Sequence, residues 1–204
     1  LLYLHRLDPE TPLQETLETF ANWQTQGHIA RIGLSNFAAW QVMKAQSIAQ
    51  ALDTKIDAIQ PMYSLVKRQA EVELLPMAAD QNITAYTYSP LGGGILSGKY
   101  TAQGKGRLPE AKRYAARYSA PDMARAAAGL SALAAELNTH PATLAVAWAK
   151  CHPTHPIPLI SARDTGQLAP SLAAADYPMT AETYARIAAL YPAPPPATDR
   201  TEEA

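Results

Sequence analysis

The sequence predicts an α/β fold, and within that class a partial (β/α)8 barrel of about five C-terminal βα units. Short apolar segments alternate with helical segments along the chain, a pattern that gives a parallel sheet with right-handed crossovers. This alternation alone is also compatible with an open doubly wound sheet. Polar residues follow several of the apolar segments directly, and this favours the barrel, because (β/α)8 enzymes build their active sites at the carboxyl ends of the strands.

The expected strands and helices follow one another without long gaps. The strand segments are 1–4, 29–34, 56–59, 83–88 and 156–160. Before the first helix, Thr11-Pro12-Leu13-Gln14 has the form of a capping box with Pro at the first helical position, and Gly27 is placed to end that helix. Further helices are expected over 38–52, over 68–80 with a kink or break at Pro76, over 124–137, from Pro141 onward, near Leu168 and over 181–191.

The two ends of the chain differ in character. Residues 1–4 read as a buried strand from the first position, without an initial Met, and this predicts an incomplete chain. We expect residues 1–191 to form the C-terminal part of a barrel. The Pro-rich segment 192–204 is predicted to be a disordered tail.

Composition excludes several kinds of partner. The chain has 17 Lys and Arg against 18 Asp and Glu, for a net charge of -1, which gives no electrostatic basis for binding nucleic acid or an acidic membrane. No apolar run approaches the roughly 20 residues of a membrane span. Cys151 is the only cysteine, so no internal disulfide can form, and a cytoplasmic location is expected. The oligomeric state is not predicted.

Five sequence motifs lie at the carboxyl ends of successive strand segments: LLYLHRLDP, IGLSNF, IQPMYSL, YSPLGGGILSGKY and PLISARDTGQL. In this order and spacing the chain resembles the aldo-keto reductases up to about residue 190. The resemblance implies a (β/α)8 barrel that uses NADPH to reduce the carbonyl group of a small aldehyde or ketone to an alcohol.

The resemblance implies a catalytic role for His5, which would help to hold the substrate carbonyl. A neutral imidazole N–H directed at the carbonyl oxygen stabilises the negative charge that hydride transfer places there. The alternative is a partly buried histidine that is hydrogen-bonded to backbone.

The same resemblance places four residues around the nicotinamide. Ser35, Asn36 and Gln60 would hold its carboxamide, and Tyr88 would stack on its ring. As alternatives, Ser35 or Asn36 could cap the helix that follows, and Tyr88 could be an ordinary strand residue. Tyr86 would then point to the same face as Tyr88.

The segment from Ser89 to Lys99 resembles the pyrophosphate loop of the family, although it matches neither the Rossmann fingerprint nor the Walker A motif. Its glycines would let backbone N–H groups approach phosphate oxygens, and Lys99 would add a positive charge. Taken alone, the run would be a flexible turn. The residues assigned to this loop are Ser89, Leu91, Gly92, Gly94, Gly98 and Lys99.

Four later residues correspond to the part of the family site that holds the adenosine 2′-phosphate and adenine: Ser161, Arg163, Gln167 and Ser171. Arg163 near a helix start suits a phosphate through its fork of donors and through the helix dipole, which favours NADPH over NADH. The sequence departs from the family at Ser161, where glycine is usual, and at Ser171, where asparagine is usual.

The tyrosine, lysine and aspartate that complete the family's mechanism have no match in this chain. We therefore expect the chain alone to be inactive. A non-catalytic NADPH-binding regulatory subunit with the same fold, and a half-barrel that assembles with another chain, remain as alternatives.

Two other features favour simple interpretations. The two histidines near Cys151 belong to a helix-to-strand connection and not to a metal site, so no metal is expected. The basic stretch 99–117 is expected to be a solvated loop over the barrel mouth.

Overall fold

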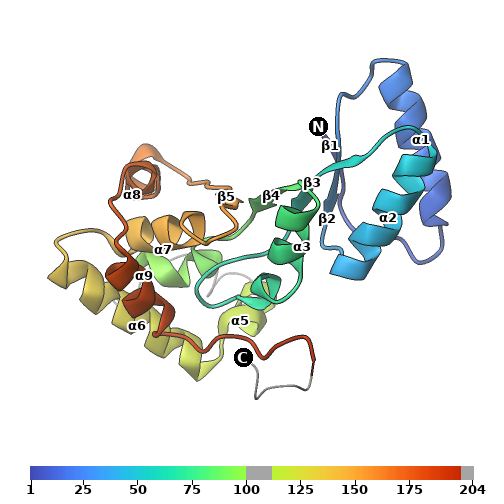
Figure 1. Ribbon diagram of the computed structural model, residues 1–204. Helices are drawn as coiled ribbons and strands as arrows, with labels where there is room; N and C mark the ends of the chain where they lie inside the picture. Colours follow the sequence, from blue (N-terminus) through green and yellow to red (C-terminus); the bar gives the residue numbers. More distant parts are fainter. Residues whose placement is uncertain (100–111, 199–204) are drawn as a thin grey trace.

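The computed structural model describes residues 1–99 and 112–198 (Figure 1). Its five strands form one sheet in the order of the sequence, and each pairs in parallel with the next. The strands are β1 (Leu2–Leu4), β2 (Ile32–Ser35), β3 (Ile56–Gln60), β4 (Thr84–Thr87) and β5 (Ile157–Pro158). Consecutive parallel strands with intervening helices are the repeating unit of a (β/α)8 barrel, so the predicted partial barrel is confirmed.

Helices connect the strands and continue beyond them. The first helices are α1 (Leu13–Thr25), α2 (Ala39–Ala51), the 3-10 turn η1 (Gln69–Glu71) and α3 (Leu74–Asp80). The 3-10 segment η2 (Gly92–Ser97) follows β4, and then come α5 (Lys112–Tyr118), α6 (Pro121–Glu136) and α7 (Pro141–Lys150). After β5 come α8 (Thr165–Leu172), the 3-10 turn η3 (Ala173–Ala175) and α9 (Ala181–Ala188).

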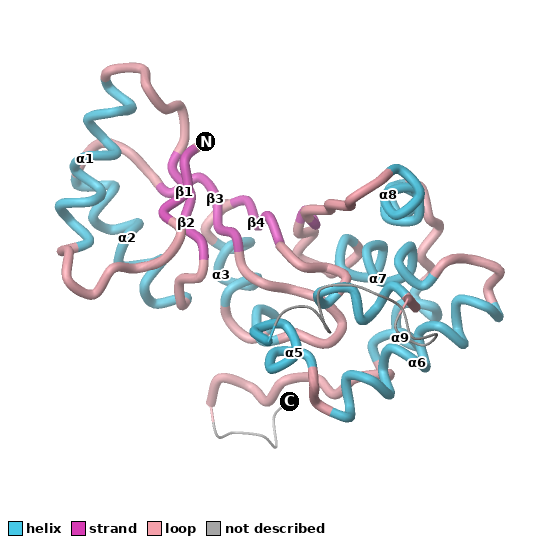
Figure 2. The backbone as a smooth tube through the Cα atoms, turned by 180° about the vertical axis from the view of Figure 1, so that it is seen from behind, coloured by secondary structure: helices cyan, strands magenta, loops and turns pink. Residues whose placement is uncertain are grey.

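The helices gather in two groups on either side of the sheet's middle strands. Figure 1 and the view from behind in Figure 2 both place α1 and α2 together beside β1 and β2, and α6 to α9 together at the other end. In α1 the apolar residues Leu13, Leu17 and Phe20 are buried at helical spacing. Every residue of α7 from Ala142 to Ala149 is buried, so this helix is an interior element between the sheet and the other helices.

Three local expectations were wrong. Thr11 does not cap α1, because its hydroxyl donates to Asp8 Oδ2 at 2.9 Å and the N-cap residue is Pro12, which has no side-chain donor or acceptor. The helix expected over 68–80 is divided into η1 and α3 before Pro76, which lies in the first turn of α3, where a missing N–H breaks no helical bond. The last strand is shorter than expected, only Ile157–Pro158.

Two further expectations fall partly outside the described residues. Within the basic stretch 99–117, residues 100–111 are not described, and α5 begins at Lys112. Of the tail, residues 192–198 form an irregular segment, and residues 199–204 are not described.

A half-buried ion pair ties α9 to the segment after β3. Arg68 bonds to both carboxylate oxygens of Glu71, at 3.0 Å through Nε and 2.9 Å through Nη2. Its Nη1 donates to the carbonyl oxygens of Ala188 at 3.2 Å and Tyr191 at 3.0 Å, at the end of α9. The Arg68 and Glu71 side chains are only 12% and 14% exposed. The guanidinium of Arg68 therefore joins segments that lie about 120 residues apart in the sequence.

Candidate functional site

A hydrogen-bonded network joins the carboxyl ends of the first four strands. Asn36 Nδ2 donates to the backbone carbonyl of His5 at 2.9 Å and to Ser35 Oγ at 3.1 Å. The Tyr88 hydroxyl donates to Asn36 Oδ1 at 2.6 Å, and Ser35 Oγ donates to the Gln60 carbonyl at 2.9 Å. We call these five residues the strand-end network. The sequence motifs placed all five of them at strand ends, and the structure brings them together.

The centre of this network is Asn36, whose backbone is left-handed with φ of 59°. Asparagine tolerates this conformation better than most residues, since its short amide can bond to nearby groups. The alternative that Ser35 or Asn36 caps the next helix is wrong. At the start of α2 the Ala38 N–H donates to Gln41 Oε1 at 2.8 Å instead.

The imidazole of His5 is exposed, and the contact that holds the residue in the network uses its backbone carbonyl. A partly buried structural histidine therefore does not describe this residue. His5 directly follows the last residue of β1, next to the other residues of the network.

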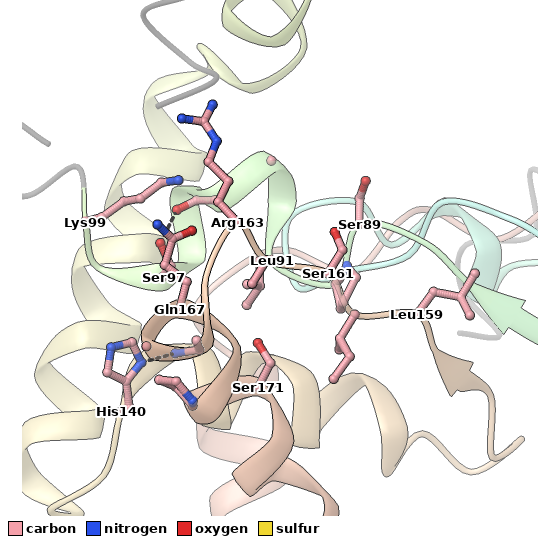
Figure 3. A pocket seen from close by; sticks show the side chains of 18 of the residues that line it. Ser89, Leu91, Ser97, Lys99, His140, Leu159, Ser161, Arg163, Gln167 and Ser171 are labelled. Carbon is pink, nitrogen blue, oxygen red and sulfur yellow. Dashed lines mark hydrogen bonds between the residues drawn. The ribbon is translucent and has the colours of Figure 1, made fainter. Parts of the chain in front are cut away.

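Next to the network lies a cavity of about 720 Å³ (Figure 3). The segment from Tyr88 to Lys99, the segment from Leu159 to Ser171 and the start of α7 line it. Nine of the fourteen residues predicted to bind cofactor line this cavity: Tyr88, Ser89, Leu91, Gly94, Lys99, Ser161, Arg163, Gln167 and Ser171. Tyr88 belongs both to the cavity and to the strand-end network, so the two regions adjoin.

The loop between β4 and the cavity takes its shape from left-handed residues, with φ of 61° at Ser89, 65° at Gly93 and 99° at Gly94. Its amides are used differently from the expectation. The Gly92 N–H donates to the Ser89 carbonyl and the Gly94 N–H to the Leu91 carbonyl, both at 2.9 Å. These two amides fold the loop, and so they are not directed at a phosphate.

Two predicted glycines, Gly92 and Gly98, do not line the cavity but pack closely against neighbours. A Cβ on Gly92 would lie 3.0 Å from both Ile95 and Val66, and one on Gly98 would lie 3.1 Å from Pro141. These glycines therefore allow close approach of chain segments behind the loop.

The cavity has a cationic end and an uncharged end. Figure 3 shows Lys99 and Arg163 together at one end and His140 and Ser171 at the other, with Gln167 between them. The start of α8 also differs from the expectation, because Asp164 Oδ1 accepts from the Gln167 N–H at 2.8 Å and so occupies one of the helix's N-terminal amides. The helix dipole therefore adds less at this end than the Arg163 side chain does.

Ser171 stands out at the uncharged end. Its side chain is buried, with 3% of the residue exposed, and its Oγ has no hydrogen-bond partner within the described residues. A buried hydroxyl without a partner is unfavourable, and Tyr3, Ser64, Thr87 and Trp148 each carry a polar atom in the same state.

Sequence reasoning missed His140, which also lines the cavity. It precedes α7 rather than a strand end, so the strand-end pattern could not find it. The available signal was its N-cap position before Pro141, which predicts a helix start but no ligand contact.

The residues present fit a phosphorylated dinucleotide. The volume lies within the 300–1,000 Å³ that is typical of ligand pockets. Two cationic side chains suit phosphate groups, and the Tyr88 ring suits a planar heterocycle.

Comparison with known families agrees with the motifs and the sheet. Residues 1–192 match the family model described as "Aldo/keto reductase family". The chain belongs to the aldo/keto reductase family. Among curated relatives, the chain is 32% identical over 200 residues to "Uncharacterized oxidoreductase YrpG" of Bacillus subtilis. This alignment covers 95% of the chain and 59% of that protein.

Two other relatives of this aldo/keto reductase chain are named for different roles, one as an aldehyde reductase and one as a channel subunit. It is 36% identical over 121 residues to "Aflatoxin B1 aldehyde reductase member 2" of Rattus norvegicus, covering 58% of this chain and 33% of that protein. It is also 32% identical over 212 aligned positions to "Probable voltage-gated potassium channel subunit beta" of rice, covering 98% of this chain and 63% of that protein. The chain thus spans less than two thirds of the length of these relatives.

Residues 1–99 and 112–198 show neither a candidate metal cluster nor a membrane-spanning helix. This part of the chain holds no group of three His, Cys, Asp or Glu side chains placed to bind a metal. His152 Nδ1 lies 2.8 Å from Thr154 Oγ1, and it accepts from the Thr154 N–H at 3.2 Å, so this ring is part of the turn after α7. Across the same described ranges, no helix has the length and apolarity needed to cross a bilayer.

Proposed function

We propose that this protein is an oxidoreductase that uses NADPH to reduce an aldehyde or ketone carbonyl of a small molecule to an alcohol. The chain would supply the cofactor-binding half of the active site and one catalytic histidine, His5. The general-acid tyrosine of the family would come from sequence that this chain does not contain. The observation that carries the proposal is the cavity, since it adjoins the strand-end network through Tyr88.

The cationic end of the cavity supports the choice of NADPH. Lys99 and Arg163 line the same end and come from segments that flank the cavity on two sides. NADPH differs from NADH by a phosphate monoester on the adenosine ribose. A guanidinium binds such a group through paired N–H donors, and so Arg163 is the residue that would read it.

The strand-end network supports a fixed position for the nicotinamide. Bound NADPH supplies the hydride, and the carbonyl oxygen gains negative charge as that hydride arrives. The exposed imidazole of His5 would donate a hydrogen bond to this oxygen. Asn36 and Ser35 would present polar atoms whose positions are already set by their mutual bonds.

The test is to measure the affinity of the complete protein for NADPH and NADH by fluorescence or calorimetry. We expect Arg163→Ala to weaken NADPH binding by about 10- to 100-fold, because a hydrogen bond to a charged group contributes about 1.5–3 kcal/mol. NADH binding should change by less than about threefold, because NADH lacks the 2′-phosphate. Arg31→Ala is a matched control, since Arg31 is an exposed arginine that does not line the cavity.

Equal losses for both cofactors would show that Arg163 does not read the 2′-phosphate. Absence of any NADPH binding to the wild-type protein would refute the proposal itself.

A second function is favoured by one comparison. The relative named as a potassium channel subunit beta covers 98% of this chain, so a non-catalytic NADPH-binding regulatory subunit is the alternative. Turnover separates the two. Reduction of 4-nitrobenzaldehyde by the complete protein with NADPH supports the enzyme, whereas NADPH binding without turnover of a panel of aldehydes and ketones supports the regulatory subunit.

A further inference from the structure

Tyr3 lies on β1, two residues before His5, and its ring lies across a glycine of the neighbouring strand. Tyr3 and Gly33 are register partners in the sheet. A Cβ built on Gly33 would lie 2.4 Å from Tyr3 Cε1 and 2.5 Å from Cδ1, which is too close for any side chain. Gly33 therefore leaves the space that the Tyr3 ring occupies, and through this space the ring extends from β1 across β2.

The face of the sheet that carries the Tyr3 ring also carries Gln60. Gly33 is paired with Ala58 of β3, and two residues further along both strands Ser35 is paired with Gln60. Side chains two residues apart on a strand share a face, so Gln60 lies on the face of Ala58 and Gly33. The ring of Tyr3 thus occupies the row of small residues directly before Gln60.

The hydroxyl at the end of this ring is buried, and within the described residues it has no partner at full hydrogen-bonding geometry. Burial raises the pKa of the Tyr3 hydroxyl, and hydrogen bonding by the neighbouring Gln60 side chain acts in the opposite direction. Gln60 takes part in the strand-end network through its backbone carbonyl and not through its amide. The network therefore leaves the orientation of the Gln60 amide to other contacts, and the Tyr3 hydroxyl is its polar neighbour.

We propose that Tyr3 is a positioning residue: its hydroxyl orients the side-chain amide of Gln60, which in turn bonds to the carboxamide of the bound nicotinamide. Tyr3 itself does not contact the cofactor, because its hydroxyl is buried. A glutamine amide has a donor end and an acceptor end, and a second partner can determine which end faces a ligand. The inference rests on the proposed function, because it requires NADPH with its nicotinamide at the strand ends.

The experiment is Tyr3→Phe in the complete protein, which keeps the ring and removes the hydroxyl. We expect NADPH to bind about 2- to 10-fold more weakly, the range that one neutral hydrogen bond gives. The affinity for 2′-phospho-ADP-ribose, which lacks the nicotinamide, should stay at the wild-type value. The free energy of unfolding without ligand should not fall, since the hydroxyl has no full hydrogen bond in the empty protein.

A double-mutant cycle shows whether Tyr3 acts through Gln60. Gln60→Ala should weaken NADPH binding, and adding Tyr3→Phe to this variant should weaken it no further. A merely structural role would give the same loss in both backgrounds. Tyr184→Phe is a matched control that should keep both affinities, since Tyr184 is a tyrosine of α9 that does not line the cavity.

Wild-type NADPH affinity in Tyr3→Phe would overturn the inference. An equal loss for 2′-phospho-ADP-ribose, or additive losses in the double mutant, would overturn it as well, because Tyr3 would then act on the fold and not on the Gln60 amide. These results leave the proposed function intact, whereas a wild-type protein that binds neither compound refutes the two together.

Discussion

At the ends of β1 to β4, Asn36 bonds to His5, Ser35 and Tyr88, whereas in the adjoining cavity the buried Ser171 hydroxyl has no partner. In the strand-end network the polar groups satisfy one another, and they hold four strand ends in register. At the cavity, the Ser171 hydroxyl is buried without a hydrogen bond, which costs stability. We therefore expect substitutions in the strand-end network to lower the free energy of unfolding, and substitutions in the cavity to lower the affinity for NADPH.

The largest effect on stability is expected from Asn36→Ala. The substitution removes the bonds to the His5 carbonyl and the Tyr88 hydroxyl, and it places alanine in a left-handed conformation. With about 1 kcal/mol for each of these two hydrogen bonds and about 1–2 kcal/mol for the backbone, the free energy of unfolding should fall by about 3–4 kcal/mol. Urea unfolding measures it.

A glycine at the same position separates the two causes. Asn36→Gly loses the same side-chain bonds but accepts the left-handed backbone, so it should be about 1 kcal/mol more stable than Asn36→Ala. If neither variant changes the unfolding midpoint, the network does not stabilise the strand ends.

A smaller effect is expected from Tyr88→Phe. This variant removes the 2.6 Å bond to Asn36 Oδ1 and keeps the aromatic ring in the cavity. The free energy of unfolding should fall by about 1 kcal/mol, and NADPH affinity should change by less than about twofold. An affinity loss without a stability loss would assign the hydroxyl to the cavity rather than to the network.

The smallest effect on stability is expected from Ser171→Ala. Because the hydroxyl lacks a partner, its removal should leave the free energy of unfolding unchanged or raise it by up to about 1 kcal/mol. NADPH should nevertheless bind about 2- to 10-fold more weakly, because the family resemblance assigns Ser171 to the adenosine end of the site. Thermal unfolding of the protein with and without NADPH measures both quantities. A clear loss of stability without NADPH would show that Ser171 stabilises the fold as the network residues do.

The strand ends could be predicted from sequence because strand periodicity and short motifs place them. His5, Asn36 and Tyr88 each follow or end an apolar segment, and parallel strands bring their carboxyl ends to one edge. The bonds between them were not predictable, because they depend on side-chain rotamers and on the left-handed backbone of Asn36.

The loop and the helix starts were harder to predict. A glycine run predicts conformational freedom, but it does not say whether an amide faces a ligand or folds the loop, and the Gly92 and Gly94 amides fold the loop. Thr11 had the right type and spacing for a helix cap, but Asp8 competes for its hydroxyl. His140 enters the cavity only through the packing of α7 on α8, which joins residues distant in sequence.

The Arg68 guanidinium also has a consequence for the order of events in folding. Its two carbonyl acceptors, Ala188 and Tyr191, are synthesised about 120 residues after Arg68 and Glu71. Until α9 forms, the largely buried guanidinium lacks part of its hydrogen bonding. Contacts of such high sequence separation form slowly, so we expect the docking of α9 against Arg68 to follow the formation of the local helices.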